Sequence, residues 1–173
     1  LPKFAMITSR GCPYECIFCD HGIFGVSYRS FSASRIVDEA EQLVTRFGAR
    51  DIAFVDSLFM PTVSRVRGIV GEMERRKLRV HWTCTIRANV ATREILDEMR
   101  RAGCWRVRIG VESGNEEVLK FIRKRVTKDQ VRAVAGHAHA AGLHPKAFFM
   151  IGHPTDTEAT IRESMAFARE LPL

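Results

Sequence analysis

The chain has 173 residues, of which 46% are hydrophobic, and it carries a formal charge of +7. This length and apolar content predict one globular domain rather than a disordered chain. No apolar run approaches the roughly 20 residues that cross a bilayer, and residues 1–10 lack the basic start and apolar stretch of a signal peptide. The basic residues lie mainly in amphipathic segments such as EMERRKLR (72–79), which favours solvated helix faces over a nucleic-acid interface. We expect a cytoplasmic domain, and because it begins with Leu we expect 1–173 to be part of a longer protein.

Apolar segments rich in β-branched and aromatic residues alternate with segments of helical periodicity. Asn115 is expected to cap a helix, residues 127–130 fit a capping box, and Gly48, Gly103 and Gly142 follow helical runs as C-caps. The expected strands are 3–8, 52–56, 80–86, 105–111 and 146–152, and the expected helices are 34–47, 62–77, 92–102, 115–123, 128–141 and 157–170.

Five successive strand–helix units predict an α/β fold with a parallel sheet and right-handed crossovers. Strands 80–86 and 105–111 alternate apolar and polar residues, whereas a strand buried on both faces reads as a continuous apolar run. One face therefore meets helices and the other meets something polar, as the lumen of a barrel would provide. We expect a partial (β/α)6 barrel truncated to about five units, with the chemistry at the carboxyl ends of its strands.

The first strand leads into SRGCPYECIFCDHG (9–22), which holds three of the five cysteines in a C-x3-C-x2-C spacing. A structural zinc site needs four ligands, and His21 is the candidate fourth. A disulfide would leave one thiol over in an intracellular chain. An iron–sulfur cluster held by Cys12, Cys16 and Cys19 would leave one iron without a protein ligand. Cys84 and Cys104 are expected to be buried, inert thiols.

The motif SRGCPYECIFC, placed between a strand and a helix, resembles the radical S-adenosylmethionine (SAM) enzymes. The segments 29–59, 110–119 and 148–161 are similar to the branch that often carries a cobalamin-binding domain, which includes anaerobic magnesium-protoporphyrin monomethyl ester cyclases and methyltransferases. The resemblance implies a 4Fe–4S cluster on the three cysteines whose open iron binds SAM. It implies reductive cleavage of SAM to a 5′-deoxyadenosyl radical, or cobalamin-dependent methyl transfer or cyclisation, on a small-molecule substrate. An electron donor such as flavodoxin or ferredoxin would be a partner.

The resemblance also suggests cofactor-binding residues near the strand ends. Phe18 precedes the third cysteine and is expected to pack against the adenine. Asp56 and Ser57 stand where many relatives have a Gly-Gly-Glu segment that binds the amino group of SAM, and the alternative for Asp56 is a helix N-cap. Arg87 is expected to bind the cofactor's carboxylate through its planar fork, and the alternative is a surface ion pair.

Three further positions complete the expected cofactor site. Glu112 and Ser113 follow a strand with a polar inner side and suit ribose or amino groups, with Arg108 as the expected partner of Glu112. Lys124 is expected either to approach the cofactor or to be a solvated lysine at a helix end. Gly152 would let the backbone approach the adenine, and the histidine that follows it is assigned to the loop only.

The fifth strand would present a bare edge, which predicts a dimer through edge-to-edge pairing. Two other functional classes stay open. A tRNA-modifying radical SAM enzyme would suit the basic charge, and a non-catalytic zinc-binding module would suit the cysteines and His21.

Overall fold

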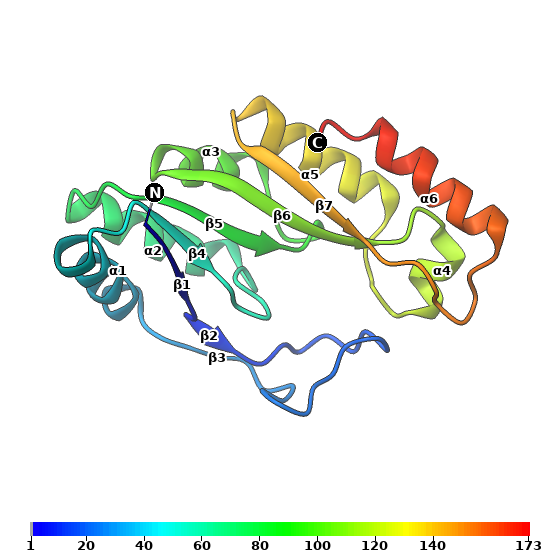
Figure 1. Cartoon of the computed structure of the whole chain (residues 1–173), viewed down its shortest axis with the longest axis horizontal. Coiled ribbons are helices and arrows are strands. Elements are labelled where there is room, and N and C mark those ends of the chain that lie inside the picture. Colours follow the sequence, from blue (N-terminus) through cyan, green and yellow to red (C-terminus); the bar gives the residue numbers. More distant parts are fainter. Residues whose placement is uncertain (1) are drawn as a thin grey trace.

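The computed structural model describes residues 2–173. Five parallel strands form one sheet in the order β1-β4-β5-β6-β7, and a short antiparallel pair, β2 with β3, lies apart from it (Figure 1). The strands are β1 (Lys3–Met6), β2 (Ser9–Arg10), β3 (Arg29–Ser30), β4 (Asp51–Phe54), β5 (His81–Ile86), β6 (Cys104–Glu112) and β7 (His144–Phe149). The predicted parallel sheet is confirmed. The β2–β3 pair was not predicted, because two residues are too few to produce a recognisable alternation.

Helices connect successive strands of the five-stranded sheet (Figure 1). Neighbouring helices pack in the order α1, α2, α3 and α5, which is the arrangement that right-handed crossovers produce. The helices are α1 (Ala33–Phe47), α2 (Val63–Arg75), α3 (Arg93–Arg101), α4 (Glu116–Phe121), α5 (Lys128–Ala140) and α6 (Glu158–Glu170).

The predicted helix signals are present in the structure. The Asn115 side chain accepts a hydrogen bond from the Val118 N–H, and Thr127 forms a reciprocal capping box with Gln130. Gly48 adopts a left-handed conformation with φ 67° and caps α1 by donating to backbone carbonyls of its last turn. These local signals define where each helix begins or ends, and hence where the adjoining loops emerge.

The core between sheet and helices is built around Trp82 of β5. The rings of Phe54 and Phe59 lie 5.5 Å and 5.9 Å from it, and the two phenylalanine rings stack at 5.0 Å. The Trp82 indole N–H donates to the Ala102 carbonyl at 2.9 Å, so its polar atom is satisfied inside the core. Burying each of these side chains stabilises the fold by about 1.5–3 kcal/mol.

The two faces of the sheet differ in burial and polarity, as the sequence predicts. In β6, Val107, Ile109 and Val111 are buried, whereas Arg108 and Gly110 on the opposite face are only half-buried. The cysteine-bearing connection between β2 and β3 runs past the carboxyl ends of the strands (Figure 1). A polar face that ends beneath this connection agrees with the expected wall of a barrel.

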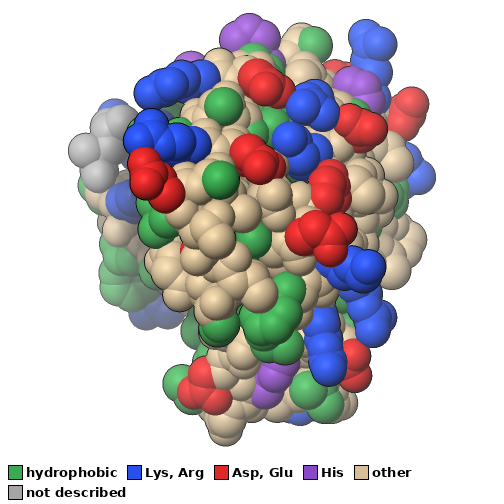
Figure 2. Space-filling model, turned by 90° about the vertical axis from the view of Figure 1, so that its right-hand side faces the viewer, with side chains coloured by type: hydrophobic (Ala, Val, Ile, Leu, Met, Phe, Trp, Pro, Cys, Tyr) green, Lys and Arg blue, Asp and Glu red, His purple; other side chains and the backbone are tan. Residues whose placement is uncertain are grey.

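Each outer strand of the described sheet, β1 and β7, pairs on one side only. Exposed hydrophobic side chains follow the end of β7, including Met150 and Ile151, and Met165 on α6 is also exposed. The side that carries α4 and α6 shows hydrophobic side chains emerging among basic and acidic ones (Figure 2). Within residues 2–173, no helix combines the length and apolar character that a membrane crossing requires.

Candidate active site

The three cysteines of the 9–22 loop line one cavity of about 200 Å³ at the carboxyl ends of the strands. Cys16 is buried, Cys12 is half-buried and Cys19 is exposed. Cys19 is exposed as a residue but its sulfur is partly desolvated, and this desolvation together with the neighbouring Cys12 and Cys16 raises the pKa of its thiol, while Lys124 acts in the opposite direction. The predicted grouping of the three thiols around a shared space is therefore present.

Asp56 fixes the start of the cysteine loop. Its carboxylate accepts hydrogen bonds from the Thr8 N–H at 2.5 Å, the Thr8 hydroxyl at 2.6 Å and the Ser9 N–H at 2.7 Å. Thr62, and not Asp56, caps helix α2. Asp56 is not among the residues that line the cavity, and its contact with the amino group of the cofactor stays a prediction. It ties the end of β1 to the end of β4, while Ser57 lines the cavity as expected.

The segment 122–125, between α4 and α5, supports the middle of the cysteine loop. The Ile17 N–H donates to the Ile122 carbonyl at 3.1 Å, and the Cys16 thiol lies 3.7 Å from the Arg123 carbonyl. The Arg125 guanidinium pairs with Glu15 at 3.1 Å. Arg123 and Arg125 have φ of 54° and 52°, a left-handed conformation that is uncommon outside glycine and that clusters at functional sites.

Arg87, directly after β5, lies against the loop from the side of the sheet. Its guanidinium stacks on the Tyr14 ring at 3.6 Å from the centroid. One nitrogen, Nη1, lies 3.7 Å from Cys16 Sγ, and the other, Nη2, donates to the Lys124 carbonyl. Arg87 is buried, so the alternative of a surface ion pair is wrong. Its contact with a cofactor carboxylate stays a prediction.

Glu112 and Lys124 form a buried ion pair in the cavity, with Lys124 Nζ 2.7 Å from Glu112 Oε1. The predicted pairing of Glu112 with Arg108 is wrong, because Arg108 donates to the Phe54 carbonyl at 3.0 Å instead. Glu112 has a φ of 74° and lies where the β6–β7 register shifts. A bulge of this kind redirects a side chain, which explains why strand alternation did not predict its partner.

Gly110 leaves room for this ion pair. A Cβ atom at Gly110 would lie 2.7 Å from Glu112 Oε1 and 2.9 Å from Lys124 Nζ. Any larger side chain at this position would displace the ends of both charged side chains. No role was predicted for Gly110, and the signal that could have suggested one is a glycine inside a strand.

Phe18 lies at another wall of the cavity and packs on Val118, Leu119 and Ile122. Its ring centroid is 5.8 Å from that of His153. His153 is buried, and its Nε2 has no hydrogen-bond partner among residues 2–173. The sequence assigned His153 only to a loop, because nothing local indicates that the 152–154 turn folds back onto Phe18.

Two further predicted cofactor residues, besides Asp56, do not line the cavity. The Ser113 hydroxyl lies 3.2 Å from that of Ser164 and accepts from the Asn115 N–H, so it joins α6 to the start of α4. Gly152 is exposed, and its N–H donates to Asp156 Oδ2 at 2.9 Å. Both residues shape the turns around the cavity, and their direct contact with a cofactor stays a prediction.

Cys84 and Cys104 are fully buried in the core, away from the cavity, as predicted. Burial, and secondarily the contact with Cys104, raises the pKa of the Cys84 thiol well above its usual range. It is therefore protonated and inert at neutral pH.

The donor set fits an iron–sulfur cluster better than a single zinc ion. Among residues 2–173, no three His, Cys, Asp or Glu side chains converge closely enough to hold one metal ion. Thiolates around one zinc lie within about 4 Å of one another, since each Zn–S bond is about 2.3 Å, whereas thiolates on a cluster bind different irons. Buried polar atoms without a partner in the described chain, Arg87 Nε and His21 Nε2, belong to residues lining the same cavity. The residues therefore fit a cluster with a polar ligand beside it.

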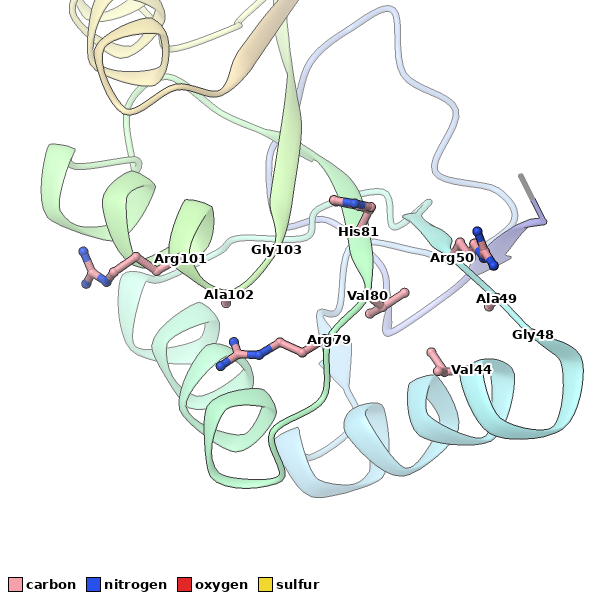
Figure 3. Close-up of a pocket in the computed structure, with 10 residues that line it drawn as sticks. All are labelled: Val44, Gly48, Ala49, Arg50, Arg79, Val80, His81, Arg101, Ala102 and Gly103. Carbon is pink, nitrogen blue, oxygen red and sulfur yellow. The ribbon is translucent and has the colours of Figure 1, made fainter.

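A larger cavity of about 470 Å³ lies at the opposite end of the sheet, where β4, β5 and β6 begin (Figure 3). Small residues at the turns into β4 and β6 leave this space open, and Arg50, Arg79 and Arg101 stand around it without converging on one point (Figure 3). It holds no cysteine and no carboxylate. Size alone therefore does not identify the active site of this chain.

Comparison with known proteins agrees with the geometry. The family model of the radical SAM superfamily matches residues 6–168. The chain belongs to the radical SAM superfamily. Radical SAM proteins are enzymes, and membership implies a 4Fe–4S cluster and SAM as the groups that the cavity accommodates.

Two curated relatives cover almost all of this radical SAM chain. It is 31% identical over 174 residues to an uncharacterized methyltransferase of Pyrococcus horikoshii, spanning 100% of this chain and 38% of the relative. It is 29% identical over 174 residues to the anaerobic magnesium-protoporphyrin IX monomethyl ester cyclase of Rubrivivax gelatinosus, spanning 98% of this chain and 30% of the relative. The chain thus spans 38% and 30% of the length of these two relatives, and the cyclase is an enzyme of the branch that the sequence predicts.

Solved radical SAM structures confirm the partial-barrel fold. The methyltransferase TsrM from Kitasatospora setae superimposes with a TM-score of 0.87 at 21% identity, covering 98% of this chain and 34% of that one. The cobalamin-dependent enzyme OxsB gives a TM-score of 0.83 at 22% identity, covering 94% of this chain and 26% of that one. At this identity the likeness establishes the fold alone.

Proposed function

We propose that this chain is the radical SAM core of an enzyme that acts on a small molecule, with Cys12, Cys16 and Cys19 as the cluster ligands. The observation that carries the proposal is that three thiols line one cavity together with a buried ion pair and an arginine. When bound, the cluster supplies one electron to the sulfonium of SAM, whose carbon–sulfur bond then breaks. Cys12, Cys16 and Cys19 would hold the cluster, and three protein ligands are one fewer than the four that such a cluster usually takes.

The chain's own side chains would orient SAM and exclude water. Phe18 would provide an aromatic wall for the adenine, and its ring lies 5.8 Å from that of His153, which does not line the cavity itself. The ion pair of Glu112 and Lys124 and the Ser57 hydroxyl offer polar contacts to ribose, amino and carboxylate groups. The buried side chains of Leu58 and Ile86 line the same cavity and would limit the access of solvent to a reactive species there.

Methyl transfer or cyclisation assisted by cobalamin is the reaction class that the relatives favour. A methyltransferase and a cyclase are similar to nearly the whole chain, and the solved structure of OxsB contains aqua-cobalamin. The electron would come from a flavodoxin or ferredoxin in the cytoplasm. The free edge of β7 would pair with a further strand, and a second copy of the chain is one source of it.

Cleavage of SAM under anaerobic conditions tests the proposal. The purified protein is reconstituted with iron and sulfide, reduced with dithionite and given SAM, with and without cobalamin. We expect methionine and 5′-deoxyadenosine, and transfer of a labelled methyl group to cobalamin if the methyltransferase assignment holds. A reconstituted protein that binds zinc alone, has no visible absorbance and leaves SAM intact would overturn the proposal. Salt-dependent binding of tRNA would instead favour the tRNA-modifying alternative.

A further inference from the structure

Arg87 contacts three parts of the site at once. Its guanidinium stacks on the Tyr14 ring at 3.6 Å, its Nη1 lies 3.7 Å from Cys16 Sγ, and its Nη2 donates to the Lys124 carbonyl. Tyr14 and Cys16 belong to the cysteine loop, whereas Lys124 belongs to the segment on which that loop rests. A planar fork with fixed donors suits this bridging role, and a lysine could not reproduce it.

The charge of Arg87 is not neutralised by a carboxylate. Within residues 2–173, no aspartate or glutamate oxygen lies within salt-bridge distance of its guanidinium. Lys124, the other buried cation of the cavity, is paired with Glu112 at 2.7 Å. Arg87 therefore contributes an unpaired positive charge in a buried site, where charge interactions are screened less than in water.

We propose that Arg87 is a positioning residue that sets the reduction potential of the cluster through Cys16. This inference rests on the proposed function, and it assigns Arg87 to the cysteine loop rather than to the cofactor's carboxylate. Reduction adds one negative charge to a cluster, and a neighbouring cation or an N–H directed at a ligand sulfur favours the more negative state. Arg87 should therefore make the cluster easier to reduce.

A mediated redox titration followed by electron paramagnetic resonance, without SAM, tests this assignment. Four variants are compared with the wild type: Arg87→Met, Arg87→Lys, Tyr14→Phe and Arg108→Met. Arg87→Met removes the charge and the donors, and we expect at least a tenfold less favourable reduction, which corresponds to about 59 mV for one electron. Arg87→Lys keeps the charge and should lie between Arg87→Met and the wild type.

Two variants serve as controls. Tyr14→Phe keeps a ring under the guanidinium, and Arg108→Met removes a cation whose Nη2 donates to the Phe54 carbonyl instead of a cysteine. Both should keep the wild-type potential. Equal iron content in all five proteins shows that the potentials describe the same cluster.

The results separate this inference from the proposed function. If the wild type loads no cluster, both the proposed function and this inference fail. If the wild type and Arg87→Met load equal iron and have the same potential, the assignment of Arg87 is wrong and the proposed function stands. If Arg87→Met loses the cluster, the potential of Arg87→Lys decides: a wild-type value overturns the assignment, and a lower value supports it.

Discussion

Lys124 Nζ lies 2.7 Å from Glu112 Oε1, and both side chains are buried in the cavity lined by the three cysteines. The two residues come from different elements, since Glu112 ends β6 and Lys124 precedes α5. Glu112 has a left-handed backbone conformation, with φ 74°, whose energetic cost of about 1–3 kcal/mol is retained where the surroundings enforce it. The pair links the sheet to the segment that supports the cysteine loop.

Replacing one residue of the Glu112–Lys124 pair should destabilise the fold more than replacing both residues. We expect Glu112→Gln and Lys124→Met each to lower the free energy of unfolding by about 3–5 kcal/mol, because each leaves a buried group without its partner. The double variant should lose clearly less than the sum, as measured by urea denaturation. The exposed pair of Arg162 and Glu158 is the control, and its coupling should be about 0.3–0.5 kcal/mol. Additive losses at Glu112 and Lys124 would contradict this interpretation.

Asp56 should contribute to stability through the start of the cysteine loop. Asp56→Asn replaces a carboxylate that accepts from Thr8 and Ser9, and hydrogen bonds to a charged group contribute about 1.5–3 kcal/mol each. We expect a loss of about 2–4 kcal/mol in thermal or urea unfolding, and faster proteolysis within residues 9–22. Asp129→Asn, at an exposed position of α5, should change stability by less than about 1 kcal/mol. Equal effects of the two substitutions would show that Asp56 has no special structural role.

The fold could be predicted from the sequence because the patterns that determine it are local. Hydrophobic alternation, caps such as Asn115 and the cysteine spacing each involve a few neighbouring residues, and they predicted the strands, the helices and the barrel wall. Contacts between side chains that are distant in the sequence could not be predicted. Ser113 turned out to bond to Ser164, and His153 to pack against Phe18, through contacts that span tens of residues. The partner of Glu112 was missed because a bulge in β6 changes the direction of its side chain.

Acid should weaken the turn that carries His153. The backbone N–H groups of Gly152 and His153 each donate to Asp156 Oδ2 at 2.9 Å. Burial, the largest single influence, raises the pKa of Asp156, but these hydrogen bonds together with Thr160 and the nearby His153 outweigh it and leave the pKa below its usual value. A lowered pKa in the folded state stabilises the protein above the unfolded value of about 3.9 and loses that contribution as the pH falls through the folded pKa.

The comparison of wild type with Asp156→Asn isolates this effect. The variant should be less stable at pH 7 by about 1–3 kcal/mol, and the difference should shrink as the pH falls below about 4. Thermal unfolding between pH 7 and pH 3 measures both curves. A difference that stays constant over this range would mean that the ionisation of Asp156 is not linked to folding.

We propose that Cys12, Cys16 and Cys19, and not the two buried cysteines, hold an iron–sulfur cluster. Iron and sulfide content after anaerobic reconstitution tests it most directly, with each of the five cysteines replaced in turn by alanine. We expect about four irons per chain in the wild type, loss of iron and brown colour in the three loop variants, and retention in Cys84→Ala and Cys104→Ala. Full iron content in Cys12→Ala, Cys16→Ala and Cys19→Ala would contradict it.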